Sequence, residues 1–193
     1  MAEQGTESED KDEDGLAIQK YEALVLVVVP PSEFAEQTLR HARSSLANVA
    51  VGTRSVSTEP DELIKGRLQD EFLVDERIDG VSLDEYAGVI FVGGEGALSL
   101  VDHPDCLRLA REAADAGKLI GAWGCSVAIP AKAGVLRRRK VTGAERVRDI
   151  VKQGGGKFTG RQLEQDKNIV TAQDEAVGIR FGKALAQIVA IWR

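Results

Sequence analysis

Residues 21–30 read YEALVLVVVP, a continuous run of apolar and β-branched side chains that ends at two consecutive prolines, Pro30 and Pro31. A strand of this composition is buried on both faces, as the strands of a parallel sheet are. We therefore expect residues 21–30 to form a central strand of a mainly parallel sheet.

Outward from this strand, strand-like and helix-like segments alternate along the chain. The further expected strands are residues 49–55, 86–92, 118–123 and 168–172. The first expected helix is capped by Ser32 and carries Ala35, Leu39, Ala42 and Leu46 on one face. Further helices are expected from Pro104 to Gly117, at 126–134 and, as a short one, at 147–151. A C-terminal helix carries Val177, Phe181, Leu185 and Ile188 along one face. Residues 56–84 are read as loop or a helical turn, with a short extended piece at 72–75.

This alternation predicts an α/β fold, a three-layer α-β-α sandwich with a mainly parallel sheet and helices on both faces. In such sheets, ligands bind beyond the carboxyl ends of the strands. Three segments are expected at that edge, namely residues 31–36, 93–96 and 123–126. Any functional site is therefore predicted to combine these three segments.

The charge of the chain is concentrated at its N-terminus. The 193 residues carry a net charge of −6, and seven of the 31 acidic residues and one of the 25 basic residues lie in residues 1–14. The remainder is balanced at 24 of each sign. We expect residues 1–18 to be a disordered acidic tail and residues 19–193 to form one domain.

The bulk features also argue against several classes of protein. A neutral fold does not favour a nucleic-acid-binding surface, and the basic run 137–140 is read as a solvated loop. The longest apolar run, residues 23–29, is too short to cross a membrane. Only two cysteines, Cys106 and Cys125, and no export signal predict a cytoplasmic protein without a disulfide. No residue cluster has metal-ligand spacing, and we expect no cofactor.

Residues 121–128 read GAWGCSVA, which predicts a strand, a sharp turn and the start of a helix. This is the layout of a nucleophile elbow, where the helix N-terminus and nearby backbone N–H groups stabilise an anion. Gly93 and Gly94 end the strand at 86–92. They either direct backbone N–H groups toward the elbow or simply form a tight turn, since both arrangements need glycine.

Over residues 22–192 the chain resembles the ThiJ/PfpI superfamily. The pieces that carry the resemblance, in order, are VVVPPSEFAE, VIFVGGEGA, GAWGCSVA, AGVLRRRKVTG and NIVTA before the last helix. The resemblance implies a flavodoxin-like, class I glutamine amidotransferase-like fold, and relatives include intracellular peptidases and the Parkinsonism-associated deglycase. It also implies a homodimer or a higher homo-oligomer.

The family's chemistry rests on an elbow cysteine, a glutamate from the first loop and, in many members, a nearby histidine. By the resemblance, the cysteine position corresponds to Gly124, the glutamate to Ala35 and the histidine to Ala144. The elbow residue is held at positive φ, which costs a residue other than glycine about 1–2 kcal/mol. Our hypothesis is that Gly124 keeps the turn but supplies no thiol, so that no catalytic residue is expected.

Cys125, one position after the elbow residue, is the alternative nucleophile. We interpret it as a small buried residue in the first turn of the helix, and Cys106 as a core residue. Glu33 and Glu36 flank the lost carboxylate position and are expected to face solvent, because acidic residues in a first helical turn interact with the helix dipole.

The predicted pocket consists of Glu33, Ala35, Glu36, Gly93, Gly94, Glu95, Trp123, Gly124, Cys125 and Ala144. The favoured function is a non-catalytic family member that binds a small molecule or a partner in this pocket. One alternative is a cysteine-dependent hydrolase or a glyoxalase- or deglycase-like enzyme that uses Cys125. Another is a stress-related or chaperone-like protein, which no particular residue supports.

Overall fold

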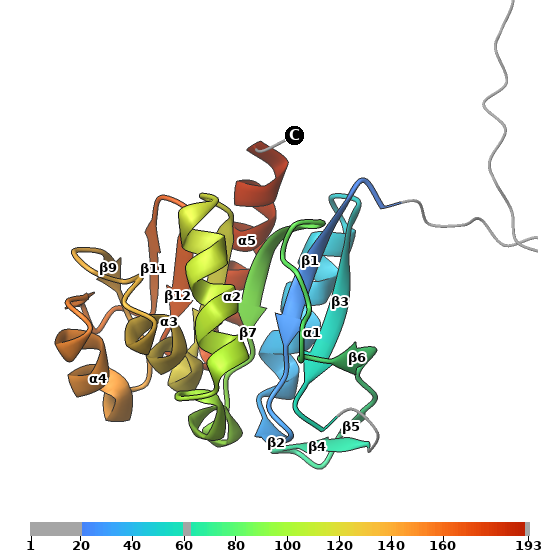
Figure 1. The fold of residues 1–193 in the computed structure, drawn as a ribbon, viewed down its shortest axis with the longest axis horizontal. Helices are drawn as coiled ribbons and strands as arrows, with labels where there is room; N and C mark the ends of the chain where they lie inside the picture. Colours follow the sequence, from blue (N-terminus) through green and yellow to red (C-terminus); the bar gives the residue numbers. More distant parts are fainter. Residues whose placement is uncertain (1–20, 60–62, 192–193) are drawn as a thin grey trace, which may run out of the picture.

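The computed structural model describes residues 21–59 and 63–191, so the predicted acidic tail lies outside the described residues. Within them, the central sheet has seven strands in the order β11-β12-β8-β7-β1-β3-β6 (Figure 1). Their bounds are β1 Ala23–Val28, β3 Val51–Ser57, β6 Glu76–Arg77, β7 Tyr86–Phe91, β8 Leu119–Trp123, β11 Leu163–Asp166 and β12 Ile169–Ala172. Neighbouring strands are parallel except β11 and β12, which are antiparallel.

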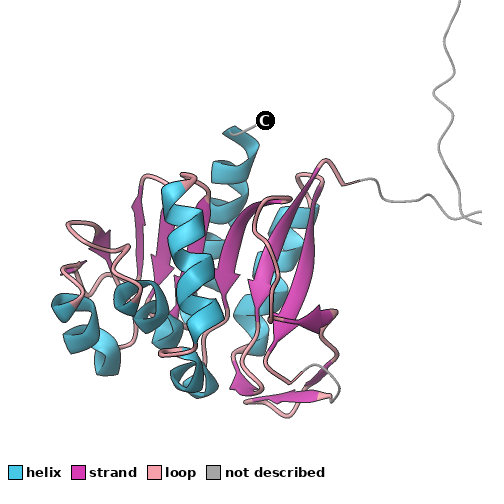
Figure 2. Ribbon diagram, in the orientation of Figure 1, coloured by secondary structure: helices cyan, strands magenta, loops and turns pink. Residues whose placement is uncertain are grey.

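Helices cover both faces of the sheet, which confirms the predicted α/β sandwich (Figure 2). One face carries α1 (Glu36–Ala47) and α5 (Gly178–Ile191), and the other carries α2 (Pro104–Asp115), α3 (Ala128–Lys132) and α4 (Arg148–Gln153). The apolar side chains of residues 25–28 in β1 point alternately to the two faces and are buried on each. Val25 and Val27 pack with α1 and α5, and Leu26 and Val28 pack with α2. None of the described helices is long and apolar enough to cross a membrane.

Short elements complete the fold. Three short 3-10 helices follow the carboxyl ends of β7, β8 and β12, at Glu95–Leu100, Gly124–Val127 and Glu175–Val177, and a fourth at Glu145–Val147 precedes α4. Two small sheets lie beside the main one. The first consists of β2 (Ser32–Phe34), β4 (Ile64–Gly66) and β5 (Glu71–Phe72), and the second consists of β9 (Lys140–Val141) and β10 (Lys157–Phe158). The carboxyl edge of the main sheet is therefore surrounded by tight turns, which position the site described below.

The first helix begins three residues later than the sequence indicated, with Ala35 and not Ser32 as its N-cap. Ser32 does not cap it, because residues 32–34 form β2, which pairs in parallel with β4. Phe34 is 1% exposed and meets the ring of Phe72 edge-on at 5.9 Å. Burying this aromatic side chain in a strand pairing outweighs the weaker capping preference of Ser32. Ala35 becomes the residue before the helix, and Glu36 its first residue.

The expectation of loop for residues 56–84 was also wrong in part. The segment contains β4, β5 and β6, and β5 overlaps the predicted extended piece only at Phe72. The sequence reading also missed β11. Among the described residues, no helix connects β3 to β7. Residues 78–85 instead run as a loop across the sheet face in front of β1, and they are held there by the buried side chains of Ile78 and Leu83 (Figure 2).

Candidate functional site

The elbow has the geometry that its sequence predicted. The chain leaves β8 at Trp123 and bends at Gly124, which has a φ of +59°. The buried hydroxyl of Ser126 donates a hydrogen bond to the Phe91 carbonyl at 2.7 Å and accepts one from the Trp123 amide at 3.1 Å. This hydroxyl joins the end of β7 to the elbow, so the bend is held by two strands.

The elbow has room for a side chain. A Cβ built on Gly124 would lie 3.9 Å from both the Gly94 amide nitrogen and the Gln173 carbonyl oxygen, which is ordinary van der Waals contact. Crowding therefore does not require glycine here, and only the positive φ favours it. A group at this position would face a backbone N–H donor, as an oxyanion would in an active elbow.

Gly93 and Gly94 are required by close contacts. A Cβ on Gly93 would lie 2.4 Å from the Trp123 carbonyl oxygen, and one on Gly94 would lie 2.2 Å from the Glu33 carbonyl oxygen. Gly94 also has a φ of +111°, and the Ala35 amide donates to the Gly93 carbonyl at 2.8 Å. The two glycines thus form a tight turn that also places the Gly94 amide near the elbow, so the two sequence interpretations are compatible.

These segments enclose a pocket of about 220 Å³, which we call the elbow pocket. It is lined by Ala35, Arg67, Gly94, Glu95, Trp123, Gly124, Cys125, Ala144, Arg146, Asp174 and Glu175. Most of the predicted residues are among these. Glu33, Glu36 and Gly93 are not among its lining residues.

Glu36 contradicts the expectation that it faces solvent, whereas Glu33 is exposed as predicted. Glu36 is only 2% exposed, and its Oε1 accepts a hydrogen bond from the Leu68 amide at 2.5 Å. The carboxylate occupies the space beside Gly66, where an added Cβ would lie 2.0 Å from Oε1. The later start of α1 moves Glu36 under the β4–β5 turn, so it anchors that turn and does not line the elbow pocket.

Four charged residues of the pocket were missed by the sequence reading. Arg67 forms an ion pair with Glu175 at 2.5 Å, and Arg146 pairs with Glu95 at 2.6 Å. Asp174 and Glu175 lie two and three residues after the end of β12 at Ala172, so the rule that sites lie beyond strand carboxyl ends could have found them. Arg67 lies in the segment 56–84, for which the sequence analysis expected no site residue.

The environments of the two cysteines oppose thiolate formation. Cys125 lines the pocket but is 5% exposed, and burial raises the pKa of its thiol. The charge of Glu95 raises this pKa further, while Arg146 acts in the opposite direction through its charge and a hydrogen bond. Burial raises the pKa of Cys106 to about 12. Both cysteines are therefore thiols at neutral pH, and a thiol is a poor nucleophile.

Two polar atoms of the pocket residues lack hydrogen-bond partners among the described residues. They are the Nε1 of Trp123, a donor, and the Oε1 of Glu175, an acceptor, and both atoms are buried. Trp123 is 1% exposed and packs edge-on against Phe181 at 5.3 Å. Buried polar groups are normally paired with protein, water or ligand.

Within residues 21–59 and 63–191, no group of three or more potential metal ligands is present.

Comparison with known proteins gives consistent matches over most of the chain. The model of the DJ-1/PfpI family matches residues 23–188. The chain is 27% identical over 163 residues to an uncharacterized protein of Methanocaldococcus jannaschii, covering 83% of this chain and 79% of that protein. It is 26% identical over 151 residues to the glutathione-independent glyoxalase DJ-1 of Schizosaccharomyces pombe, covering 75% and 78%. A ThiJ/PfpI domain protein from Brachyspira murdochii superposes with a TM-score of 0.83 at 24% identity, covering 89% and 98% of the two chains, which shows the shared fold.

Proposed function

The chain belongs to the DJ-1/PfpI family, and from this premise we propose that it has lost the elbow nucleophile and keeps its pocket for non-catalytic binding. One observation carries the proposal. Gly124 has the positive φ of an elbow residue, and the space around it would accept a side chain, yet only a hydrogen is present there. A covalent mechanism needs a nucleophilic side chain at the bend, and glycine has none.

The two other positions that the resemblance associates with chemistry support the same conclusion. Ala35 and Ala144 both line the elbow pocket, and their methyl groups can neither donate nor accept a proton. A chain that had lost only its nucleophile would keep a carboxyl or imidazole group at one of these positions. The loss of all three groups supports a pocket that no longer performs covalent chemistry.

The polar lining supports binding of a small polar molecule. Arg67 and Arg146 bring positive charge into the pocket, and Glu95, Asp174 and Glu175 bring negative charge. These guanidinium groups donate hydrogen bonds and these carboxylates accept them, so the lining suits a ligand that carries both an acceptor and a donor.

The second candidate is a cysteine-dependent enzyme that uses Cys125. It is favoured by the position of Cys125 in the pocket wall and by the Arg146 guanidinium, which lowers the pKa of the thiol. A relative in Schizosaccharomyces pombe bears the name of a glyoxalase. Against this candidate, burial raises the pKa of Cys125, and no hydrogen bond joins its thiol to a carboxylate within the described residues.

Labelling with iodoacetamide at neutral pH separates the two candidates. We expect Cys125 to react as slowly as the buried Cys106, and we expect no turnover of glyoxal, a small reactive aldehyde. Rapid labelling that disappears in Cys125→Ser would reject the non-catalytic proposal, as would glyoxal turnover that the same substitution abolishes. Cys106→Ser is the matched control, because it removes the other thiol from the chain.

We also propose a homodimer or a higher homo-oligomer, which rests on the family resemblance. Light scattering on a size-exclusion column measures the molar mass directly. A mass of one chain, 20.8 kDa, over the micromolar range would contradict this proposal.

A further inference from the structure

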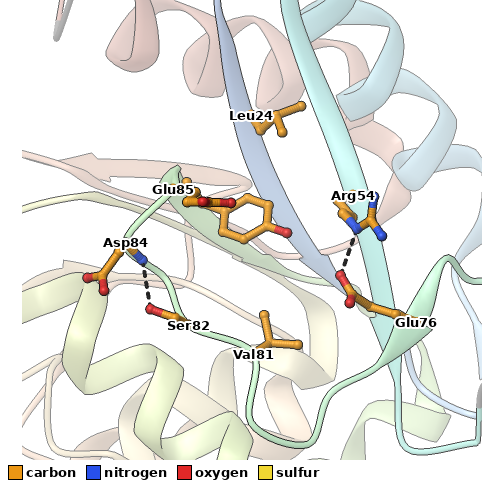
Figure 3. A pocket seen from close by; sticks show the side chains of 8 residues that line it. Leu24, Arg54, Glu76, Val81, Ser82, Asp84 and Glu85 are labelled. Atoms are coloured by element: carbon orange, nitrogen blue, oxygen red, sulfur yellow. Dashed lines mark hydrogen bonds and ion pairs between the residues drawn. The ribbon is translucent and has the colours of Figure 1, made fainter.

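A second hollow, of about 510 Å³, lies away from the elbow pocket, where β1 and β7 begin. We call it the trough. It is lined by Leu24, Arg54, Glu76, Val81, Ser82, Asp84, Glu85 and Tyr86 (Figure 3). It shares no lining residue with the elbow pocket, so it needs a separate explanation.

The trough exists because the connection from β3 to β7 covers the sheet with a loop. By contrast, the crossovers from β1 to β3, from β7 to β8 and from β8 to β12 each place a helix on the sheet. The loop at 78–85 buries Ile78 and Leu83, but it does not cover the start of β1. Leu24 is therefore 36% exposed, although β1 is a central strand with a partner on each side. This exposed sheet face forms part of the trough.

Tyr86 supplies an unpaired polar group in this hollow. It is 8% exposed, and no hydrogen bond joins its hydroxyl to another described residue. Burial raises the pKa of this hydroxyl, the charges of Glu76 and Glu85 raise it further, and Arg54 opposes them. These three charged residues all line the trough, so the hydroxyl lies among them. The hydroxyl oxygen remains accessible in the trough, where it can accept a hydrogen bond.

The charges around the trough favour a cation. Arg54 donates through Nε to the Oε1 of Glu76 at 2.7 Å, and the two side chains meet on one side of the hollow (Figure 3). Asp84 lies on the other side, and its amide donates to the Ser82 hydroxyl at 3.2 Å (Figure 3). With Glu85, the lining carries three carboxylates and one guanidinium. The Lys118 ammonium lies at the rim, where it donates to the carbonyl oxygens of Leu83 and Asp84, and even with this charge included the carboxylates outnumber the cations, which favours a positive ligand.

We propose that the trough binds an alkylammonium group whose carbon stem lies against Leu24 and Val81. An ammonium has three N–H donors and no acceptor. The Tyr86 hydroxyl and the carboxylates of Glu76 and Glu85 supply three acceptors, and the two aliphatic side chains supply an apolar surface for the stem. The same chemistry is offered by a free alkylamine and by a lysine side chain of a partner protein. The inference is independent of the function proposed for the elbow pocket.

Titration of the full chain with n-butylammonium, followed by the NMR shifts of backbone amides, tests the proposal. We expect saturable shifts at millimolar concentration that centre on residues 82–86 and Arg54. The neutral analogue n-butanol should bind at least about tenfold more weakly, because it lacks the charge. Added salt should weaken binding of the ammonium but not of the alcohol.

Variants locate the binding. Glu76→Gln and Tyr86→Phe should each weaken n-butylammonium binding about three- to tenfold. The control is Glu145→Gln, since Glu145 also pairs with an arginine, Arg148, at 2.7 Å and lies outside the trough. The proposal is overturned if no shifts appear in the trough, if n-butanol binds equally well, or if Glu76→Gln and Tyr86→Phe both bind as tightly as the Glu145→Gln control.

A lysine with both backbone ends blocked distinguishes the two sources of the ammonium. If it binds at least as tightly as n-butylammonium, a lysine side chain of a partner is the ligand that fits. If n-butylammonium binds about tenfold more tightly, a free alkylamine is the ligand, because the blocked backbone then clashes at the rim. Either result supports the trough as an ammonium site, and the failure of both probes contradicts it.

Discussion

The elbow pocket and the trough are two hollows on one sheet, and different parts of the chain shape them. The part of the elbow pocket around Gly124 is formed by backbone, with Gly94 and Gly124 at positive φ and with close contacts that require glycine at Gly93 and Gly94. The trough is formed by side chains and by a loop that leaves part of β1 uncovered. A pocket defined by backbone keeps its shape when its reactive side chains are lost, whereas the trough depends on the side chains that line it.

The strongest test of this difference is Gly94→Ala. The added Cβ would lie 2.2 Å from the Glu33 carbonyl oxygen at a φ of +111°, so both overlap and backbone strain oppose it. We expect the free energy of unfolding to fall by about 3–5 kcal/mol, measured by urea denaturation. Gly160→Ala is the control, because Gly160 also has a positive φ, +70°, but its Cβ would meet nothing within 4 Å. It should lose only about 1 kcal/mol, and an equal loss in both variants would contradict the role of close contacts.

A second test restores the lost groups, as Gly124→Cys combined with Ala35→Glu. The Cβ site at Gly124 is open, so Gly124→Cys should cost about 1–2 kcal/mol of unfolding free energy, from positive φ alone. The new thiol lies near the Gly94 amide, which stabilises a thiolate. We expect it to react with iodoacetamide at least about tenfold faster than Cys125 at neutral pH. A new thiol as slow as Cys106 would show that the pocket has lost its shape as well as its chemistry.

Beside the trough, Asp75→Asn tests how β6 is attached to β3. Burial raises the pKa of Asp75, but hydrogen bonds from the Ser55 hydroxyl at 2.6 Å and the Ser55 amide at 2.7 Å outweigh it, and the pKa is lowered. A carboxyl whose pKa is lowered by folding stabilises the protein above its unfolded-state pKa, and this stabilisation is lost as the pH falls through the folded-state pKa. We expect Asp75→Asn to cost up to about 1 kcal/mol at pH 7, because the site is partly exposed to solvent.

Urea denaturation of the wild type and of Asp75→Asn at several pH values measures this effect. The difference in unfolding free energy should shrink as the pH falls below about 4, where the wild-type carboxyl becomes protonated. A difference that is constant with pH would show that the charge of Asp75 has no role.

The smallest expected effect is that of Tyr86→Phe on stability. Because the Tyr86 hydroxyl makes no hydrogen bond to another described residue, its removal should change the free energy of unfolding by less than about 0.5 kcal/mol. Ser126→Ala removes a buried hydroxyl that has partners at the elbow, and it should cost about 1–2 kcal/mol. If Tyr86→Phe is as costly as Ser126→Ala, the Tyr86 hydroxyl has a structural partner and the trough loses its unpaired acceptor.

The elbow was the most predictable part of the site, since each of its features is local. Its strand, bend and helix follow from eight consecutive residues, and Gly124 has the positive φ expected from that pattern. Glu36 was wrongly expected to face solvent because its burial depends on the start of α1, which the pairing of β2 with β4 determines. Arg67 was not found at all, since its place in the pocket depends on a short turn that is held by Glu36.

The sequence by itself determined the α/β class, the central position of β1 and the bend at Gly124, because hydrophobic runs and glycine conformations act over a few neighbouring residues. Only the tertiary structure decided which charges line the elbow pocket and where the sheet is left uncovered. Arg67 and Glu175 are 108 residues apart in the chain yet form an ion pair, and Leu24 is exposed only because a distant loop does not reach it. Such contacts depend on how separate elements pack against each other, and no local pattern records that packing.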